Sequence, residues 1–431
     1  MGILVKSASL VLAQDSRRRI LRDVDVLAEG GRISAVGQVK GKAGAEFVID
    51  GRGKLLLPGL SNTHTHLGMT LLRGYCDDKK FHEWWGRVRL IEAKLKPHHV
   101  YWGSLLGCLE MIRGGTTSFA DSYFHMGEVA KAVQESGLRA NLAYAMIDFG
   151  DEKKRKSELA EGERFFGEWN GKAGGRIACS FAPHAPYSCS KELLLSAAAA
   201  AKRRKARLQI HVSETRKEVF EAKKKLGKRP VEYLDSIGFL GKNVIAAHCV
   251  WVTKSEASML AKRGAFPSHC PVSNLKLASG ESAPITEILN AGGRFTLGTD
   301  GAASNNSLSM LETMKFSALI EKGSRWDASA LGAQKVLDAA TRTGSEALGF
   351  GAGSIEEGRL ADFILLGLKS PNMAPMHNPV SHIVYSANPS NVLDVVVNGK
   401  PLMLDGKILS VDEEKAIEKA EKEAFALVEK C

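Results

Sequence analysis

The sequence has few of the features that mark membrane, secreted or disulfide-bonded proteins. No run reaches about 18 consecutive apolar residues, so we expect no membrane-spanning helix and no membrane partner. The first segment, MGILVKSASL, contains a lysine and no long apolar stretch, which argues against a secretory signal peptide. Only seven of the 431 residues are cysteines, and no two of them form a CxxC pair. These absences argue against a cysteine-based zinc site and a disulfide framework, and they predict a cytoplasmic protein.

Nucleic-acid recognition motifs are also missing, although the chain carries a formal net charge of +11. Much of the excess lies at residues 202–205 and 223–225, beside Ala-rich or Glu-rich helical sequence, where cations favour the C-terminal turns of helices. No aromatic RNA-binding motif, basic arm or zinc finger accompanies these clusters. We therefore expect a small-molecule partner and no nucleic acid, and we leave homo-oligomerisation open.

The middle of the chain alternates short β-rich runs with amphipathic helical stretches. Strands are predicted at residues 60–65, 116–121, 140–147, 176–182, 208–212, 244–248, 265–269 and 295–299. Helices are predicted at residues 100–113, 127–136, 191–205, 217–236, 254–263 and 283–290. Eight strands with intervening helices are typical of a closed parallel barrel. We therefore predict an α/β fold built on a (β/α)8 TIM-like barrel.

The two ends of the chain have a different pattern, in which apolar and polar residues alternate between Gly-rich turns. This alternation is typical of antiparallel sheets with one buried face. Neither end has enough strands for an independent sheet, so we expect both ends to form one composite β-sandwich domain. The predicted division is residues 1–57 and 354–431 for the small β-domain and 58–353 for the metal-dependent barrel, with a Glu/Lys-rich terminal helix from about Asp412.

The first predicted barrel strand ends in the motif His64-Thr65-His66. Residues two apart on a strand project to the same side, so both imidazoles point together. Active sites of such barrels lie at the carboxyl ends of the strands, and two neutral imidazoles are half of a first-row metal site. Alone, an HxH pair is more often a packing, surface or hydrogen-bonding feature than a metal site. The motif therefore needs partners elsewhere in the chain.

Polar groups end three other predicted strands. His211 and Glu214 follow one apolar run, His248 ends the next, and Asp300 follows the last. An isolated histidine or aspartate at such a position is usually structural, with satisfied hydrogen bonds. Because the barrel brings the strand ends together, these groups and the HxH pair predict a metal site.

Several sequence motifs of the chain match those of a known family. The matching stretches are LPG at 57–59, HTH at 64–66, MTLLRG at 69–74, DSYFH at 121–125, PHAPY at 183–187, HVSE at 211–214, AHCV at 247–250, SNLKL at 273–277 and GTDGAASNN at 298–306. They resemble the amidohydrolase superfamily and, within it, the 5-methylthioadenosine/S-adenosylhomocysteine deaminase subfamily. The resemblance covers nearly the whole chain, including the composite β-domain.

The resemblance implies one divalent metal ion per subunit, with a water completing its coordination. The implied metal ligands are His64, His66, His211 and Asp300. It also implies that Glu214 shuttles protons, that His248 contacts the hydrolytic water, and that Asp300 accepts the proton of that water. Zinc is the favoured ion, although imidazoles and one carboxylate also suit iron and manganese.

The fourth predicted strand argues for a single metal. Relatives with two metals bridge them with a carboxylated lysine at the end of this strand. Here the strand runs into Phe181-Ala182-Pro183-His184, which contains no lysine. A mononuclear site is therefore favoured, and His184 becomes a candidate hydrogen-bonding partner for the substrate base.

Two further positions match residues that hold the nucleoside in the resembling family. Trp84 is placed to stack on or cover a base, and Glu92 to accept the protons of two ribose hydroxyls. The alternative is a helix with a buried tryptophan and a solvated glutamate. The family also uses arginines after the third strand to bind a substrate carboxylate. Here Tyr144 stands near that place, and the basic residues 153–156 are expected in a polar loop with no aligned counterpart.

The predicted function is hydrolytic deamination of an adenosine derivative to the inosine derivative and ammonia. 5′-Methylthioadenosine, S-adenosylhomocysteine, 5′-deoxyadenosine and adenosine are the substrates considered. Two alternatives stay open: an amidohydrolase acting on another amino- or halo-substituted heterocycle (guanine, cytosine or an s-triazine), and a catalytically inactive binding protein. Glu92 and Trp84 favour a ribose-bearing ligand, and the complete set of ligands with Glu214 argues against an inactive scaffold.

Overall fold

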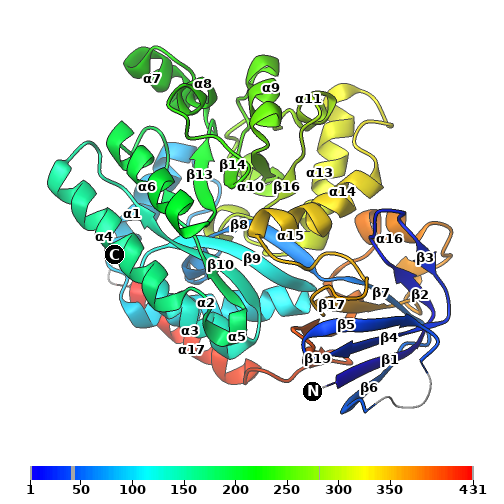
Figure 1. Ribbon diagram of the computed structural model, residues 1–431. Helices are drawn as coiled ribbons and strands as arrows, with labels where there is room; N and C mark the ends of the chain where they lie inside the picture. The colour runs from blue at the N-terminus through cyan, green and yellow to red at the C-terminus, as the bar shows by residue number, and fades with distance from the viewer. Residues whose placement is uncertain (1, 40–43, 281, 430–431) are drawn as a thin grey trace.

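The computed structural model describes residues 2–39, 44–280 and 282–429, and its main body is a barrel of parallel strands (Figure 1). Strands lie in all eight predicted regions. They are β8 (Leu60–Thr65), β9 (Thr116–Tyr123), β10 (Arg139–Met146), β11 (Ile177–Cys179) with β12 (Ala182–Pro183), β13 (Leu208–Val212), β14 (Val244–His248), β15 (Phe266–His269) and β16 (Thr296–Leu297). The α/β fold with a TIM-like barrel is confirmed.

Two parallel sheets make up the barrel wall, in the orders β11-β10-β9-β8 and β13-β14-β15-β16. A parallel bridge between Phe181 and Leu208 joins them on one side. On the other side, the Asp300 N–H donates to the His64 carbonyl at 2.9 Å, and the Thr63 hydroxyl donates to the Leu297 carbonyl at 3.0 Å. These bonds close the barrel between its first and last strands, and so bring residues about 235 positions apart into contact.

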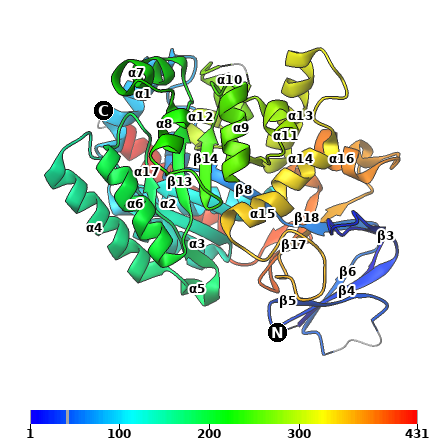
Figure 2. The same cartoon turned by 45° about the horizontal axis from the view of Figure 1, so that its top comes forward.

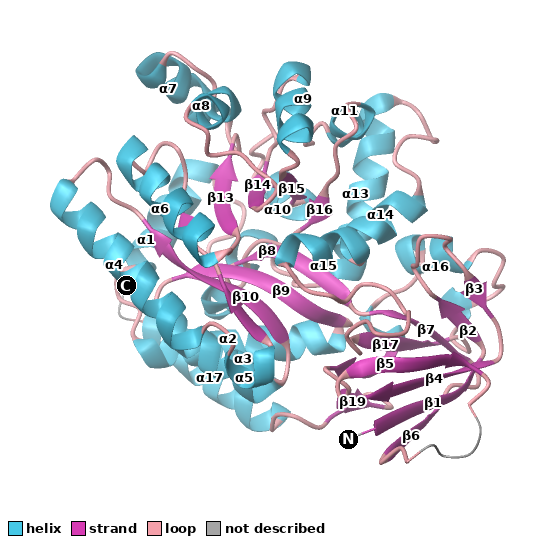
Figure 3. Ribbon diagram, in the orientation of Figure 1, coloured by secondary structure: helices cyan, strands magenta, loops and turns pink. Residues whose placement is uncertain are grey.

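Helices surround the strands (Figure 3). Those that bear on the site or the barrel wall are α1 (Phe81–Glu92), α2 (Pro97–Arg113), α3 (Met126–Ser136), α4 (Glu152–Trp169), α6 (Lys191–Arg204), α7 (Arg216–Leu226), α8 (Pro230–Ser236), α9 (Lys254–Arg263), α10 (Pro271–Lys276), α11 (Ile285–Asn290), α13 (Met310–Arg325), α14 (Ala333–Ala340) and α15 (Arg342–Leu348). Within the described ranges, none of the helices combines the length and the apolar character needed to cross a bilayer.

Two of the predicted segments, one helix and one loop, differ from the structure. The single helix expected at 217–236 is divided into α7 and α8, because Gly227 has a φ of 69° and Pro230 begins the second helix. The polar loop expected at 153–156 is wrong, because these residues form the first turns of α4. The Asp151 carboxylate caps this helix by accepting the Lys154 N–H.

Both chain ends meet in a β-rich region beside the barrel (Figure 2). Its seven-stranded sheet has the order β20-β19-β18-β17-β7-β2-β3, and its four-stranded sheet has the order β5-β4-β1-β6. The strands are β1 (Gly2–Ala8), β2 (Leu10–Leu12), β3 (Ile20–Leu21), β4 (Val24–Glu29), β5 (Arg32–Gly37), β6 (Phe47–Asp50), β7 (Lys54–Pro58), β17 (Phe363–Gly367), β18 (Val392–Val397), β19 (Lys400–Leu404) and β20 (Lys407–Ile408).

The pairing of β7 with β17 joins the two ends, since Leu56 lies opposite Leu365 in an antiparallel register. Both side chains are buried in one apolar cluster with Ile3, Val26 and Phe363. β7 ends at Pro58 and β8 begins at Leu60, so we propose 1–57, 58–353 and 354–431 as the domain division. The terminal helix α17 (Glu413–Val428) returns to pack on α2 of the barrel, where Arg113 forms an ion pair with Glu413.

Candidate active site

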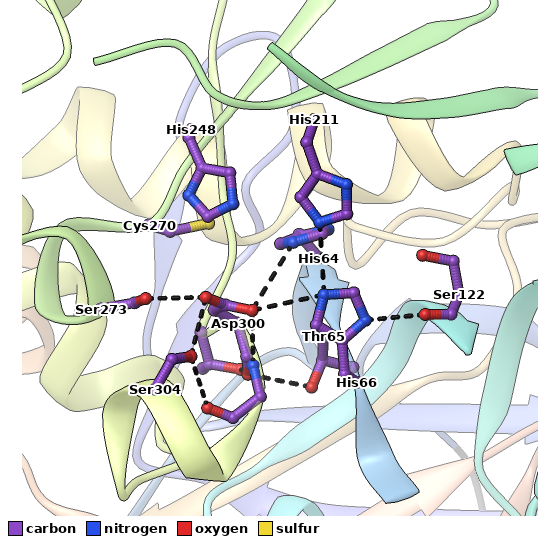
Figure 4. Close-up of polar contacts among 12 residues, drawn as sticks. His64, Thr65, His66, Ser122, His211, His248, Cys270, Ser273, Asp300 and Ser304 are labelled. Carbon is purple, nitrogen blue, oxygen red and sulfur yellow. Dashed lines mark hydrogen bonds and ion pairs between the residues drawn. The ribbon is translucent and has the colours of Figure 1, made fainter. Parts of the chain in front are cut away.

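The carboxyl ends of three strands, β8, β13 and β16, place the four predicted metal ligands around one point (Figure 4). Asp300 Oδ1 lies 3.7 Å from His64 Nε2 and 3.5 Å from His66 Nε2. His66 Nε2 in turn lies 3.3 Å from His211 Nε2. The four side chains are buried or nearly so, with His66 at 11% side-chain exposure. The structure therefore brings together all four residues that the sequence nominated as ligands.

Hydrogen bonds to backbone carbonyls decide which ring nitrogen of two histidines is free. His66 Nδ1 lies 2.7 Å from the Ser122 carbonyl, and His211 Nδ1 lies 2.8 Å from the His184 carbonyl. Because a carbonyl only accepts, each Nδ1 carries the proton and each Nε2 presents a lone pair. Two lone pairs that face each other at 3.3 Å repel unless a cation lies between them.

His64 adds an orphaned donor atom to the same point. Its Nε2 is buried and has no hydrogen-bond partner. Burial, together with the neighbouring imidazoles, holds the pKa of His64 and of His211 well below the ordinary value, so both rings are neutral. Neutral imidazole is the form that ligates a metal ion. The two Nε2 lone pairs of His66 and His211, the unpartnered Nε2 of His64 and one carboxylate oxygen fit a single divalent cation.

Asp300 is fixed in place by its own loop and by α10. Its Oδ2 accepts the Ser273 and Ser304 hydroxyls, each at 2.7 Å, and its Oδ1 accepts the Gly301 N–H at 2.7 Å. Burial raises the pKa of Asp300, but the neighbouring His66 and His248 and the two hydroxyls outweigh burial and lower it. The side chain is therefore an ionised carboxylate.

Strained backbone conformations occur at the strand ends that carry the site. His248 has a φ of 70°, Asp300 a φ of 64°, and Ser213, between His211 and Glu214, a φ of 52°. Side-chain-bearing residues rarely adopt this left-handed region, and such strain clusters at functional sites. Gly298 permits the close approach of the last strand to the first, since a Cβ there would lie 2.8 Å from the His64 Cβ.

Glu214 and His248 face each other above the predicted ligands. Glu214 Oε2 lies 3.9 Å from His248 Nε2, and His248 Nδ1 lies 3.0 Å from the Asn274 side-chain oxygen. Burial raises the pKa of Glu214 above its ordinary value. Glu218 holds the intervening loop by accepting the Ser213 and Glu214 N–H groups. Sequence reasoning did not find Asn274 or Glu218, whose roles depend on tertiary contacts.

A cavity of about 740 Å³ extends from the histidines towards α1 and α4. Of the residues predicted to bind substrate, Glu92 and His184 line it, whereas Glu214 and Asp300 are not among its lining residues. Glu92 Oε1 accepts the Tyr123 hydroxyl at 2.7 Å, and burial raises the pKa of Glu92. The Tyr123 ring packs directly over Gly68, where a Cβ would lie 2.5 Å from a ring carbon. Tyr123 was also missed as a site residue, although it stands two positions after Asp121 on the same strand.

Trp84 lines the cavity, but most of its side chain packs against other apolar residues. Its side chain lies in an apolar cluster with Leu72 and Val88, the residue is 6% exposed, and its indole N–H donates to the Ala303 carbonyl at 3.2 Å. The next residue, Trp85, is 39% exposed and also lines the cavity. The sequence alone did not show which of these two neighbours is buried. The Trp85 ring is the more exposed of the two in the cavity.

Comparison with known proteins agrees with this geometry. The model of the amidohydrolase family matches residues 55–402. The chain is 46% identical to the 5′-deoxyadenosine deaminase of Methanosarcina mazei, over 99% of this chain and 98% of the relative. It is also 46% identical to the 5-methylthioadenosine/S-adenosylhomocysteine deaminase of Thermococcus sibiricus, over 94% of each chain.

Solved structures show the same architecture. An adenosine deaminase from Xanthomonas campestris with bound zinc superimposes with a TM-score of 0.93 at 32% identity, covering 99% of this chain and 98% of the other. Atrazine chlorohydrolase from Arthrobacter aurescens TC1, complexed with zinc, gives a TM-score of 0.92 at 25% identity, covering 98% of this chain and 100% of the other. The family match spans well over half of the sequence and the relatives align along nearly all of it, so this protein belongs to the amidohydrolase family.

Proposed function

We propose that the protein is a metal-dependent hydrolytic deaminase that converts an adenosine derivative and water to the inosine derivative and ammonia. The observation that carries this proposal is the convergence of His64, His66, His211 and Asp300 beneath the facing pair of Glu214 and His248. The relatives named as deaminases of 5′-deoxyadenosine and of 5-methylthioadenosine/S-adenosylhomocysteine support it, at 46% identity over nearly the whole chain.

His64, His66, His211 and Asp300 would hold one divalent ion, and the zinc in two solved relatives favours zinc. When bound, such an ion supplies a Lewis acid that lowers the pKa of a coordinated water to about 7. The lone pairs directed at one point and the orphaned His64 Nε2 are what support this assignment.

The protein's own residues handle the protons. Asp300 is ionised and accepts the proton of the attacking water, while His248 holds that water through its Nε2. Glu214, whose pKa is raised, donates a proton to the purine ring nitrogen next to the amino-bearing carbon. A carbon–oxygen bond forms and the carbon–nitrogen bond breaks, as the departing amine takes up the proton held by Asp300 and leaves as ammonia. The proton of the new hydroxyl returns to Glu214 as the product carbonyl forms.

The cavity wall supports a nucleoside over a free base. Glu92 is placed to accept hydrogen bonds from both ribose hydroxyls, and Tyr123 fixes the orientation of that carboxylate. His184 lines the same cavity beside His211, with ring centroids 4.7 Å apart, and would bind the base. A free heterocycle such as an s-triazine has no hydroxyls for Glu92.

A substrate panel tests the proposal. Zinc-loaded protein should release ammonia from 5′-deoxyadenosine, 5′-methylthioadenosine or adenosine, with ultraviolet spectra shifting to those of the inosine derivatives. Turnover of guanine, cytosine or an s-triazine, without turnover of any adenosine, would instead favour another amidohydrolase reaction. Failure to bind stoichiometric metal and to turn over any of these compounds would indicate an inactive scaffold.

A further inference from the structure

The outer wall of the cavity is formed by α4 and the segment before it. Tyr144, Phe149, Glu161 and Arg164 line this wall. The histidines and Glu92 line other parts of the same cavity, so we take a group at the 5′ position of a ribose held by Glu92 to extend towards this wall.

Arg164 is the one cation of α4 that lines the cavity, and carboxylates of its own helix occupy it. Its Nε donates to Glu161 at 2.8 Å and its Nη2 donates to the other Glu161 oxygen, which makes a bidentate pair. Its Nη1 donates to Glu168 at 2.8 Å. The hydrogen bond from Arg164 lowers the pKa of Glu161, so the carboxylate stays charged. One guanidinium therefore faces two carboxylates, and the cluster carries a net negative charge.

The other charged residues next to Arg164, Glu161 and Glu168 bring no further cation into the cavity lining. Glu158 accepts the Ile147 N–H at 2.9 Å and the Tyr144 hydroxyl at 3.4 Å. Lys154 lies over the Phe149 ring, 5.4 Å from its centroid, and does not line the cavity. Glu128, another lining residue, pairs with Lys131. A negatively charged group that reached this wall would meet like charge.

We propose that the wall formed by α4 selects adenosine derivatives whose 5′ substituent carries no carboxylate, because Glu161 and Glu168 occupy Arg164. Hydroxyl, methyl and methylthio substituents are accepted, and the carboxylate of a homocysteine tail is disfavoured. This inference rests on the proposed deaminase function, and it makes Glu161 and Glu168 determinants of specificity.

Arg89 is the cation on the opposite side of the cavity. Its guanidinium lies 4.7 Å from the centroid of the Trp85 ring. It also lies near enough to Glu92 to offset part of the rise that burial causes in the pKa of that carboxyl. Arg89 therefore provides the competing explanation for any turnover of a carboxylate-bearing substrate, and the experiment includes it.

The test is the ratio of kcat/KM for S-adenosylhomocysteine to that for 5′-deoxyadenosine, measured with zinc-loaded enzyme. The wild-type ratio should be below about one tenth, because the substrate carboxylate would meet a cluster of net negative charge whose one guanidinium is already paired. The double variant Glu161→Gln/Glu168→Gln frees Arg164 and should raise the ratio about tenfold. Adding Arg164→Ala to that variant should remove the gain. Glu163→Gln removes the same charge from α4, but Glu163 pairs with Arg203 and Arg204, so the ratio should not change.

Binding of the products gives a readout that does not depend on turnover. Calorimetric affinity for S-inosylhomocysteine, relative to 5′-deoxyinosine, should rise in the double variant by the same factor. An equal wild-type preference for both substrates, or an unchanged ratio in the double variant, would overturn the inference. So would a loss of S-adenosylhomocysteine turnover confined to Arg89→Ala. Failure of the proposed function looks different, because wild-type enzyme would then deaminate neither nucleoside.

Discussion

At the carboxyl ends of the barrel strands His64 Nε2 is buried without a hydrogen-bond partner, whereas at the face towards the small β-domain a buried ion pair is fully satisfied. There, Arg139 donates from Nε and Nη2 to both oxygens of Asp362, at 2.6 and 3.1 Å, and Asp362 also accepts the Asn398 N–H. Buried polar groups are normally paired. The contrast separates a face prepared for a ligand from a face that stabilises the fold.

The backbone at the first face is strained as well. His248 and Asp300 hold strained left-handed conformations at the first face, and the structure around them compensates for that cost. A substitution at the first face should therefore abolish chemistry, whereas one at the second should reduce stability. Four variants test this division between the two faces.

His66→Ala should have the largest effect. Removing one Nε2 donor should lower metal content to near zero and kcat/KM by more than about 10³-fold, because the Lewis acid is lost with the ligand. Metal analysis and steady-state ammonia release measure both. His377→Ala, at an exposed histidine, is the control. Wild-type metal content in His66→Ala would remove this residue from the ligand set.

Glu214→Gln should separate chemistry from metal binding. We expect full metal content and a loss in kcat of about 10²–10⁴-fold, the range for a general acid–base residue. Glu221→Gln changes a glutamate of α7 that pairs only with surface lysines, and should behave as wild type. Undiminished turnover in Glu214→Gln would refute its assigned role.

Asp362→Ala should act on the other face. It leaves the Arg139 charge buried and unpaired, which costs about 3–5 kcal/mol of the free energy of unfolding. Urea unfolding measures this loss, and kcat/KM of the folded fraction should stay close to wild type. Asp50→Ala breaks an exposed pair with Arg52 and should leave the midpoint unchanged. A catalytic defect without a stability loss in Asp362→Ala would contradict the division into two faces.

Tyr123→Phe should have the smallest effect. Losing the hydroxyl that orients Glu92 should raise KM for 5′-deoxyadenosine about tenfold, with metal content unchanged and kcat altered less. Tyr101→Phe, which breaks a similar bond to the surface residue Glu135, is the control. A KM equal to wild type would mean that Glu92 is positioned without Tyr123.

The strand periodicity and the chain order of polar groups were enough to predict the barrel and the convergence of polar side chains at a metal site, whereas the family resemblance indicated which four of them are the ligands. His64 and His66 share a face because side chains alternate on a strand, and closed-barrel geometry brings Asp300 beside them. These inferences depend on regular structure, so they hold over long separations in sequence. The sheet formed by β7 and β17 follows from the same alternation at the two chain ends.

Side-chain choices on helices were less predictable. Trp84 and Trp85 are adjacent on α1, and only tertiary packing decides that the first is buried and the second exposed. Residues 153–156 read as a loop because α4 places its buried aromatics, Phe165 and Phe166, far from its charged first turns. The bond between Tyr123 and Glu92 joins two elements that no sequence pattern pairs.

The most direct measurement is anomalous X-ray scattering from crystals of the zinc-loaded protein. We expect one zinc ion per chain. The ion should lie about 2.0–2.1 Å from the Nε2 atoms of His64, His66 and His211 and about 2.0–2.2 Å from an Asp300 oxygen. An ion bound elsewhere, or no ordered ion among these four side chains, would contradict it.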